Sequence, residues 1–171
     1  MSDATTPTVH DEVRIEAVPS EVWKLVSDIG LPARLSPELQ RTAWLDGATG
    51  PELGARFEGF NRHPVAGEWR SVSHVVALEP ERRFGWAVTK DDADDPATAL
   101  AIWTFELHPE DGGTRLSFAA RVWPERTKLG AMMDGAPEKA QEILAARLGE
   151  LGAGIGATLQ GVKKLAEEAA A

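Results

Sequence analysis

Residues 137–168 have the sequence PEKAQEILAARLGELGAGIGATLQGVKKLAEE, in which apolar side chains recur at intervals of three and four. The recurring positions are Leu144, Leu148, Leu151, Ile155, Leu159, Val162 and Leu165. This spacing predicts a long amphipathic helix, because residues three and four apart share one helix face. Pro137 and Glu138 suit its first turn. At 1.5 Å per residue the helix would extend roughly 48 Å.

The predicted helix is unusually rich in glycine, with Gly149, Gly152, Gly154, Gly156 and Gly161 inside it. Each glycine costs about 1 kcal/mol relative to alanine in a helix interior. Two interpretations stay open. Either the helix bends between Gly149 and Gly161, or this thinned face makes room for a ligand.

The chain before this helix is typical of antiparallel β-structure. Short runs rich in Val, Phe, Trp and Thr are separated by turn signals such as Asp46-Gly47 and Asp111-Gly112-Gly113. They predict six strands at about residues 40–46, 54–62, 68–78, 83–90, 99–107 and 114–123. Their short connections favour an antiparallel meander.

A further strand and two short helices are predicted near the N-terminus. Apolar and polar residues alternate from Val9 to Ala17, as in a strand with one solvent-exposed face. Pro19 opens a short amphipathic helix that Gly30 ends, and a very short helix follows within residues 31–39. We therefore expect an α+β fold, in which a curved seven-stranded antiparallel sheet wraps around the long C-terminal helix. Residues 9–168 are expected to form a single domain, and residues 1–8 a flexible tail.

Composition and charge restrict the function. The 171 residues include 18 basic and 27 acidic side chains, which gives a formal net charge of −9. Such a surface disfavours nucleic acid as a partner, because phosphate binding requires Lys and Arg. The chain has no cysteine, which excludes disulfides and thiol catalysis. With neither a signal-like N-terminus nor a run of about 18 apolar residues, we expect a cytoplasmic monomer or homodimer without membrane insertion.

Six local motifs occur along the chain. They are VPSEVW at residues 18–23, WLDG at 44–47, GARFEGFNR at 54–62, RFGW at 83–86, WTFEL at 103–107 and GGTRL at 112–116. Together they resemble the START-like (SRPBCC) superfamily, and its polyketide cyclase/dehydrase branch in particular, over residues 9–165. The resemblance implies a helix-grip fold with a cavity between the sheet and the long helix. Members of this superfamily include aromatic polyketide cyclases and binders of lipids and hormones.

Strand alternation predicts which side chains face that cavity. The expected ligand contacts are Phe57, Asn61, Trp69, Ser71, Ser73, Trp86, Trp103 and Phe118, together with Met132 in a flexible loop before the long helix. Apolar walls with a few polar groups are typical of ligand pockets. The alternative is that the rings fill a core while Asn61 and the serines bond to nearby backbone or buried water. The same alternation places Ala77 inside and His74 on a solvated outer face.

These expectations favour binding of a hydrophobic, aromatic or polyketide-like small molecule. The alternative is a polyketide cyclase/dehydratase-like enzyme, which needs a general acid or base beside its ligand. The candidate catalytic residues are Asn61 and His63, although His63 beside Pro64 also suits a surface turn. A role in protein interaction is a third hypothesis. The sequence has neither an HExxH motif nor a Gly-rich phosphate loop, and the acidic run at residues 90–95 reads as a solvated hairpin tip, so no metal or cofactor is predicted.

Overall fold

The computed structural model describes residues 6–90 and 93–171. The strands among these residues are β1 (Thr8–Ile15), β2 (Leu39–Trp44), β3 (Arg56–His63), β4 (Gly67–Glu79), β5 (Arg83–Lys90), β6 (Ala101–Glu110) and β7 (Gly113–Val122). The α-helices are α1 (Pro19–Val26), α2 (Leu31–Leu35), α3 (Lys128–Gly135) and α4 (Ala140–Ala170). The predicted tail at residues 1–8 lies largely outside the described residues, and so does part of the predicted hairpin tip at residues 90–95.

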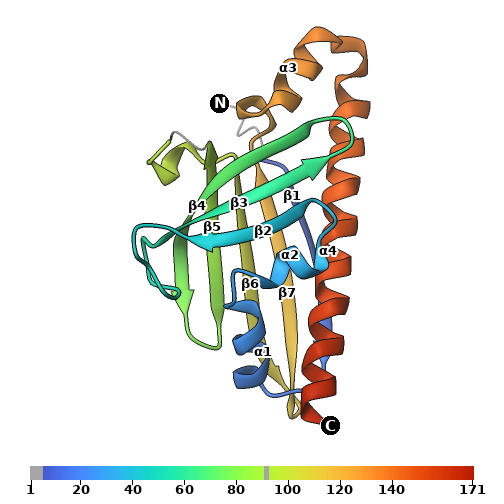
Figure 1. Cartoon of the computed structure of the whole chain (residues 1–171). Helices are drawn as coiled ribbons and strands as arrows, with labels where there is room; N and C mark the ends of the chain where they lie inside the picture. Colours follow the sequence, from blue (N-terminus) through green and yellow to red (C-terminus); the bar gives the residue numbers. More distant parts are fainter. Residues whose placement is uncertain (1–5, 91–92) are drawn as a thin grey trace, which may run out of the picture.

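The strands form one antiparallel sheet in the order β1-β7-β6-β5-β4-β3-β2. From β2 to β7 each strand pairs with its neighbour in sequence, and β1 pairs with β7. Figure 1 shows α4 running along the curved sheet, with α3 beyond its N-terminal end and α1 towards its C-terminal end. Helix α4 packs on β1, β7, α1 and α2. The predicted helix-grip fold is therefore confirmed.

The inner face of α4 is packed unevenly along its length. Its C-terminal part is largely buried from Leu151 onward, and Ile155 and Val162 have no exposed surface. Near its N-terminal end, Leu144 and Leu148 are half-buried. Close packing thus fixes the C-terminal part of α4, while the N-terminal part covers the sheet more loosely.

Helix α4 is continuous over 31 residues, so the glycines do not break it. The predicted first turn at Pro137 is instead a separate 3₁₀ turn, Pro137–Lys139. Gly161 lies where α2 approaches, because a Cβ added there would be 2.5 Å from Leu35 Cδ2. Beside Gly154 and Gly156, apart from the neighbouring backbone of α4 itself, no atom of the described residues lies within 4 Å of an added Cβ. Close packing therefore explains Gly161 but not these two.

Two predicted positions were wrong for local reasons. The register between β4 and β5 shifts between Val75 and Ala77, so Ala77 lies opposite Gly85 on the outer face. Such a bulge exchanges the two faces of a strand. Met132 lies in α3 rather than in a loop, and it is 48% exposed.

Within the described part of the chain, no helix has both the length and the apolar character required to cross a bilayer.

His74 also differs from its predicted position, because it is 5% exposed rather than solvated. It lies on the outer face, where the segment after β5 packs over β4. His74 Nε2 is 3.3 Å from Thr89 Oγ1, and that hydroxyl donates to the carbonyl oxygen of Ala93 at 3.0 Å. Strand alternation reports the face of a side chain but not what covers that face.

We expect His74 to make the fold sensitive to acid. Burial is the main cause that lowers the pKa of His74, and the charge of Arg56 lowers it further. Together they outweigh the opposing charges of Asp94 and Asp95. In the unfolded chain a histidine protonates near pH ~6.5. Below that pH the unfolded state binds a proton that the folded state excludes, so the free energy of unfolding falls as the pH decreases towards the folded-state pKa.

This expectation is checked by urea unfolding at a series of pH values. The H74Q variant should lose less stability than the parent between pH ~6.5 and pH ~5. The H10Q variant is the control, because His10 is exposed and its replacement should leave the pH dependence unchanged. Parallel pH profiles for the parent and H74Q would contradict the assignment.

Candidate functional site

The centre of the inner sheet face is filled by aromatic rings. Trp86 is 8% exposed, and its ring centroid lies 5.5 to 6.2 Å from those of four neighbours. These neighbours are Phe57, Phe84, Phe105 and Phe118. Phe105 and Phe118 stack with centroids 3.9 Å apart. The predicted wall residues Phe57, Trp86 and Phe118 are therefore brought together, but as parts of one packed cluster.

Trp103 lies at the margin of this cluster, and Trp69 lies further along the same sheet face, towards the β3–β4 hairpin. Both are half-buried, and Trp103 packs against Phe118 with ring centroids 5.3 Å apart. On α4, Leu144 and Leu148 are also half-buried. The apolar inner face is thus less completely covered near the N-terminal part of α4 than at the centre of the sheet.

Uncharged polar groups adjoin Trp69. Asn61 lies directly opposite Trp69 and Gly59 lies opposite Ser71 in the β3–β4 ladder. Asn61 Nδ2 donates to Ser71 Oγ at 3.2 Å and makes a longer contact of 3.4 Å with the Trp69 carbonyl oxygen. The Ser71 hydroxyl hydrogen and Asn61 Oδ1 are not used in this bond. Ser73 follows on the same face and is 3% exposed.

His63 is engaged at both ring nitrogens. Its Nδ1 accepts from the backbone N–H groups of Val65 at 3.0 Å and Ala66 at 3.2 Å. Its Nε2 lies 2.6 Å from Glu150 Oε2 on α4. Because Nδ1 accepts, the ring proton is on Nε2 and is donated to Glu150. The predicted catalytic candidate therefore joins the β3–β4 hairpin to α4.

Arg147 extends this contact to the start of β2. Its guanidinium donates to both carboxylate oxygens of Glu38, at 2.8 and 3.1 Å, and to Glu150 Oε2 at 3.2 Å. We call His63, Glu150, Arg147 and Glu38 the clamp. Its members come from β3, α4 and the segment before β2, so it ties three separate parts of the chain together.

The clamp shifts the titration of two of its own members. Burial acts against the charge of Arg147, but the hydrogen bond and charge of Glu38, with those of Glu150, outweigh it and raise the pKa of Arg147. Burial likewise acts to raise the pKa of Glu150, but His63 and Arg147 together lower it below its ordinary value. Charge pairing thus dominates desolvation in the clamp.

Glu38, His63 and Glu150 offer potential metal-ligand atoms within 4.8 Å of one another. Arg147, however, already provides a cation for both carboxylates. A metal on His63 Nε2 would also displace the ring proton, while Nδ1 still faces two N–H donors. The donor set therefore fits an ion-pair network better than a metal centre.

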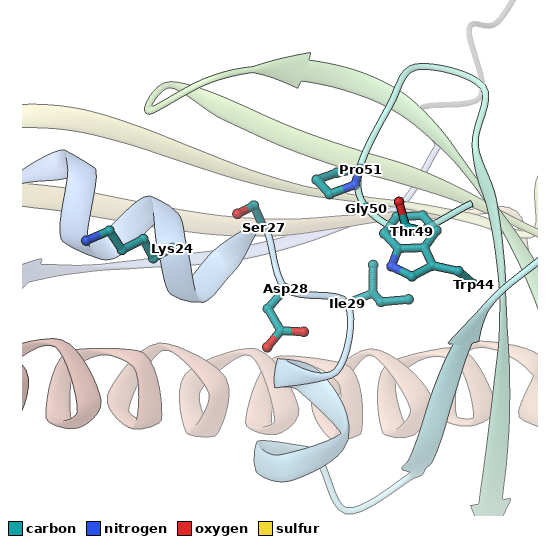
Figure 2. Close-up of a pocket in the computed structure, with 8 residues that line it drawn as sticks. All are labelled: Lys24, Ser27, Asp28, Ile29, Trp44, Thr49, Gly50 and Pro51. Atoms are coloured by element: carbon teal, nitrogen blue, oxygen red, sulfur yellow. The ribbon is translucent and has the colours of Figure 1, made fainter. Parts of the chain in front are cut away.

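A surface cleft of about 290 Å³ lies between the end of α1 and the β2–β3 connection (Figure 2). It is lined by Lys24, Ser27, Asp28, Ile29, Trp44, Thr49, Gly50 and Pro51. Its polar side chains serve the local fold, since Asp28 accepts from the Gly30 N–H and Ser27 donates to the Trp23 carbonyl. None of the lining residues is a predicted ligand contact. One of them, Trp44, packs edge-on against Phe57, which is a predicted contact.

The seven-stranded sheet and the long helix that packs on it define a helix-grip protein. The chain matches the family described as "Polyketide cyclase / dehydrase and lipid transport" over residues 6–153, and it belongs to that family. It is similar to the Polyketide_cyc-like protein Cgl2372 from Corynebacterium glutamicum, with 31% identity and a TM-score of 0.65. That alignment covers 94% of this chain and 91% of the other.

Two aromatase/cyclase structures are similar in fold. The di-domain ARO/CYC StfQ from the steffimycin biosynthetic pathway is 16% identical, with a TM-score of 0.67, over 95% of this chain and 51% of that one. The Zhui aromatase/cyclase from Streptomyces sp. R1128 is 17% identical, with a TM-score of 0.64, over 96% of both chains. At these identities the likeness shows the fold alone. No curated protein matches the chain.

Proposed function

We propose that this protein binds an apolar small molecule on the inner face of the sheet, beneath the N-terminal part of α4. The observation that carries the proposal is the half-buried Trp69, which lies opposite Asn61 in the ladder and beside the bonded pair Asn61 and Ser71. Apolar surfaces with a few uncharged polar groups suit ligands of this kind. Membership in a family whose description includes lipid transport supports it.

Each part of this surface has a role in the proposed complex. Trp69 offers a ring face to a flat apolar ligand, Trp103 offers a second ring further along the same face beside Trp86, and Phe57, Trp86 and Phe118 form the floor. Asn61 Oδ1 accepts a hydrogen bond from the ligand, and the Ser71 hydroxyl donates one to it. These two groups together bind a single polar atom of the ligand and so fix the ligand's orientation. All these side chains are uncharged, which favours an uncharged ligand.

Two further residues are proposed as ligand contacts. Ser73, deeper along β4, provides a second hydroxyl on the same face. Met132 on α3 is exposed, and its flexible side chain would suit ligands of varied shape that reach it.

The alternative, a cyclase- or dehydratase-like activity, requires a proton donor or acceptor beside the ligand. His63 is engaged by the hairpin amides and by Glu150, and the Asn61 amide orients a ligand without exchanging protons at neutral pH. The observations therefore favour binding over catalysis.

The test is titration with N-phenyl-1-naphthylamine, a neutral apolar fluorophore. We expect saturable binding to one site, and we expect W69A to weaken it about tenfold, which corresponds to about 1.4 kcal/mol. W44F is the control, because Trp44 lines the surface cleft and touches the proposed floor only edge-on, at Phe57. Non-saturable binding, or a larger loss in W44F than in W69A, would refute the proposed site.

A further inference from the structure

We infer that the N-terminal part of α4, residues 140–150, is a lid that the clamp holds closed and that swings on the glycines after it to admit a ligand. The role given to the lid, which is to admit a ligand, rests on the proposed function. The existence of the lid is inferred from three independent features of the chain. These are the long-range polar contacts of the lid, its loose apolar packing and the glycines at its base.

The first feature is that polar contacts attach the lid to distant segments. Arg147 binds Glu38 through two hydrogen bonds of 2.8 and 3.1 Å, which joins the lid to the start of β2. Glu150 accepts from His63 at 2.6 Å, which joins it to the β3–β4 hairpin. The backbone links these two anchors, because the Arg62 N–H donates to the Glu38 carbonyl oxygen at 2.8 Å. The lid is therefore fixed to one continuous edge of the sheet.

The clamp can be released without unfolding the molecule. Its side chains retain solvent contact, with 16% of His63, 26% of Arg147 and 44% of Glu150 exposed. Water can therefore hydrate these groups when the contacts break, unlike a fully buried ion pair. The ring of His63 keeps its hydrogen bonds to Val65 and Ala66 in the process, so the hairpin retains its turn.

The second feature is the packing of the lid on the sheet. Leu144 and Leu148 are half-buried, whereas Leu151 is 9% and Ile155 0% exposed. Lifting residues 140–150 therefore exposes far less additional apolar surface than lifting the rest of the helix would. A boundary of local stability falls near Leu151.

The third feature is the run of glycines at that boundary. Residues 149–156 contain four glycines, and at Gly154 and Gly156 no described atom outside the neighbouring backbone of α4 lies within 4 Å of an added Cβ. Packing therefore does not require glycine at either position, in contrast to Gly161, where Leu35 fills the space. Glycine weakens a helix by its backbone freedom, so this segment is the natural place for α4 to bend.

The experiment measures hydrogen–deuterium exchange of the full chain without ligand, together with the association rate of N-phenyl-1-naphthylamine. The double variant E38Q/E150Q weakens the clamp. We expect it to raise exchange in residues 140–150 at least tenfold, to leave residues 155–166 unchanged, and to speed probe association. The double variant G154A/G156A stiffens the hinge, and we expect slower exchange in the lid and association slowed several-fold.

E167Q is the matched control, because it removes an ion pair with Lys163 on the same helix outside the lid. It should change neither measurement. Unchanged lid exchange in E38Q/E150Q, or a rise spread evenly along α4, would overturn the lid. Faster lid exchange in a protein that fails to bind the probe would support the lid and refute the proposed function, so the two failures are distinguishable.

Discussion

Replacement of Trp86 by alanine is expected to lower the free energy of unfolding by about 3–5 kcal/mol. Trp86 is 8% exposed and is surrounded by Phe57, Phe84, Phe105 and Phe118. Its truncation removes apolar contacts with all four rings and leaves a hole that the surrounding rings fill only in part. Urea unfolding of the parent and W86A measures the loss.

The hole in W86A should also bind indole, because dry apolar cavities accept small aromatic molecules of matching size. Indole should then raise the free energy of unfolding of W86A as its concentration exceeds the dissociation constant, and it should have a smaller effect on the parent. W123A is the control, because the Trp123 ring contacts Arg121 and Arg126 and is outside the ring cluster. A loss below about 1 kcal/mol in W86A would show that Trp86 lines open space rather than a packed core.

Strand alternation predicted the inner face well, because residues two apart share a face whatever the rest of the chain does. Trp86 lies opposite Trp103, and Phe105 lies opposite Phe118, so the rings meet on the predicted side. The prediction failed at Ala77, where a bulge leaves no signal in the apolar pattern. For His74 the face was right, and the error came from the connection that packs over it.

The clamp could not be predicted from sequence. Arg147 and Glu38 are 109 residues apart, and His63 and Glu150 are 87 residues apart. Their meeting depends on where the hairpin tip reaches α4, which no local pattern encodes. Helix α3 did leave a local signal, because Thr127 caps it by accepting from the Leu129 N–H. Two glycines within its eight residues obscured that signal.

Replacement of Gly113 by alanine is expected to lower the free energy of unfolding by about 2–3 kcal/mol. A Cβ at this position would lie 2.5 Å from the Ile15 carbonyl oxygen and 3.0 Å from Arg14 Nη2. The oxygen belongs to the backbone of β1, where Ile15 pairs with Thr114, and Ile15 has no exposed surface. Relief of the clash must therefore move β1 away from β7 and disturb the core beneath Ile15.

The neighbouring G112A variant separates this clash from backbone strain. Gly112 has φ +80° in the tight turn between β6 and β7, and no described atom lies within 4 Å of an added Cβ. Alanine there costs about 1–2 kcal/mol through the left-handed conformation alone. Urea unfolding should therefore rank G113A as the more damaging variant. The opposite ranking would mean that β1 yields readily at Ile15. In that case β1 would not be rigid at this end of the sheet. The buried part of α4 packs on β1, and the lid needs that rigid support in order to move separately.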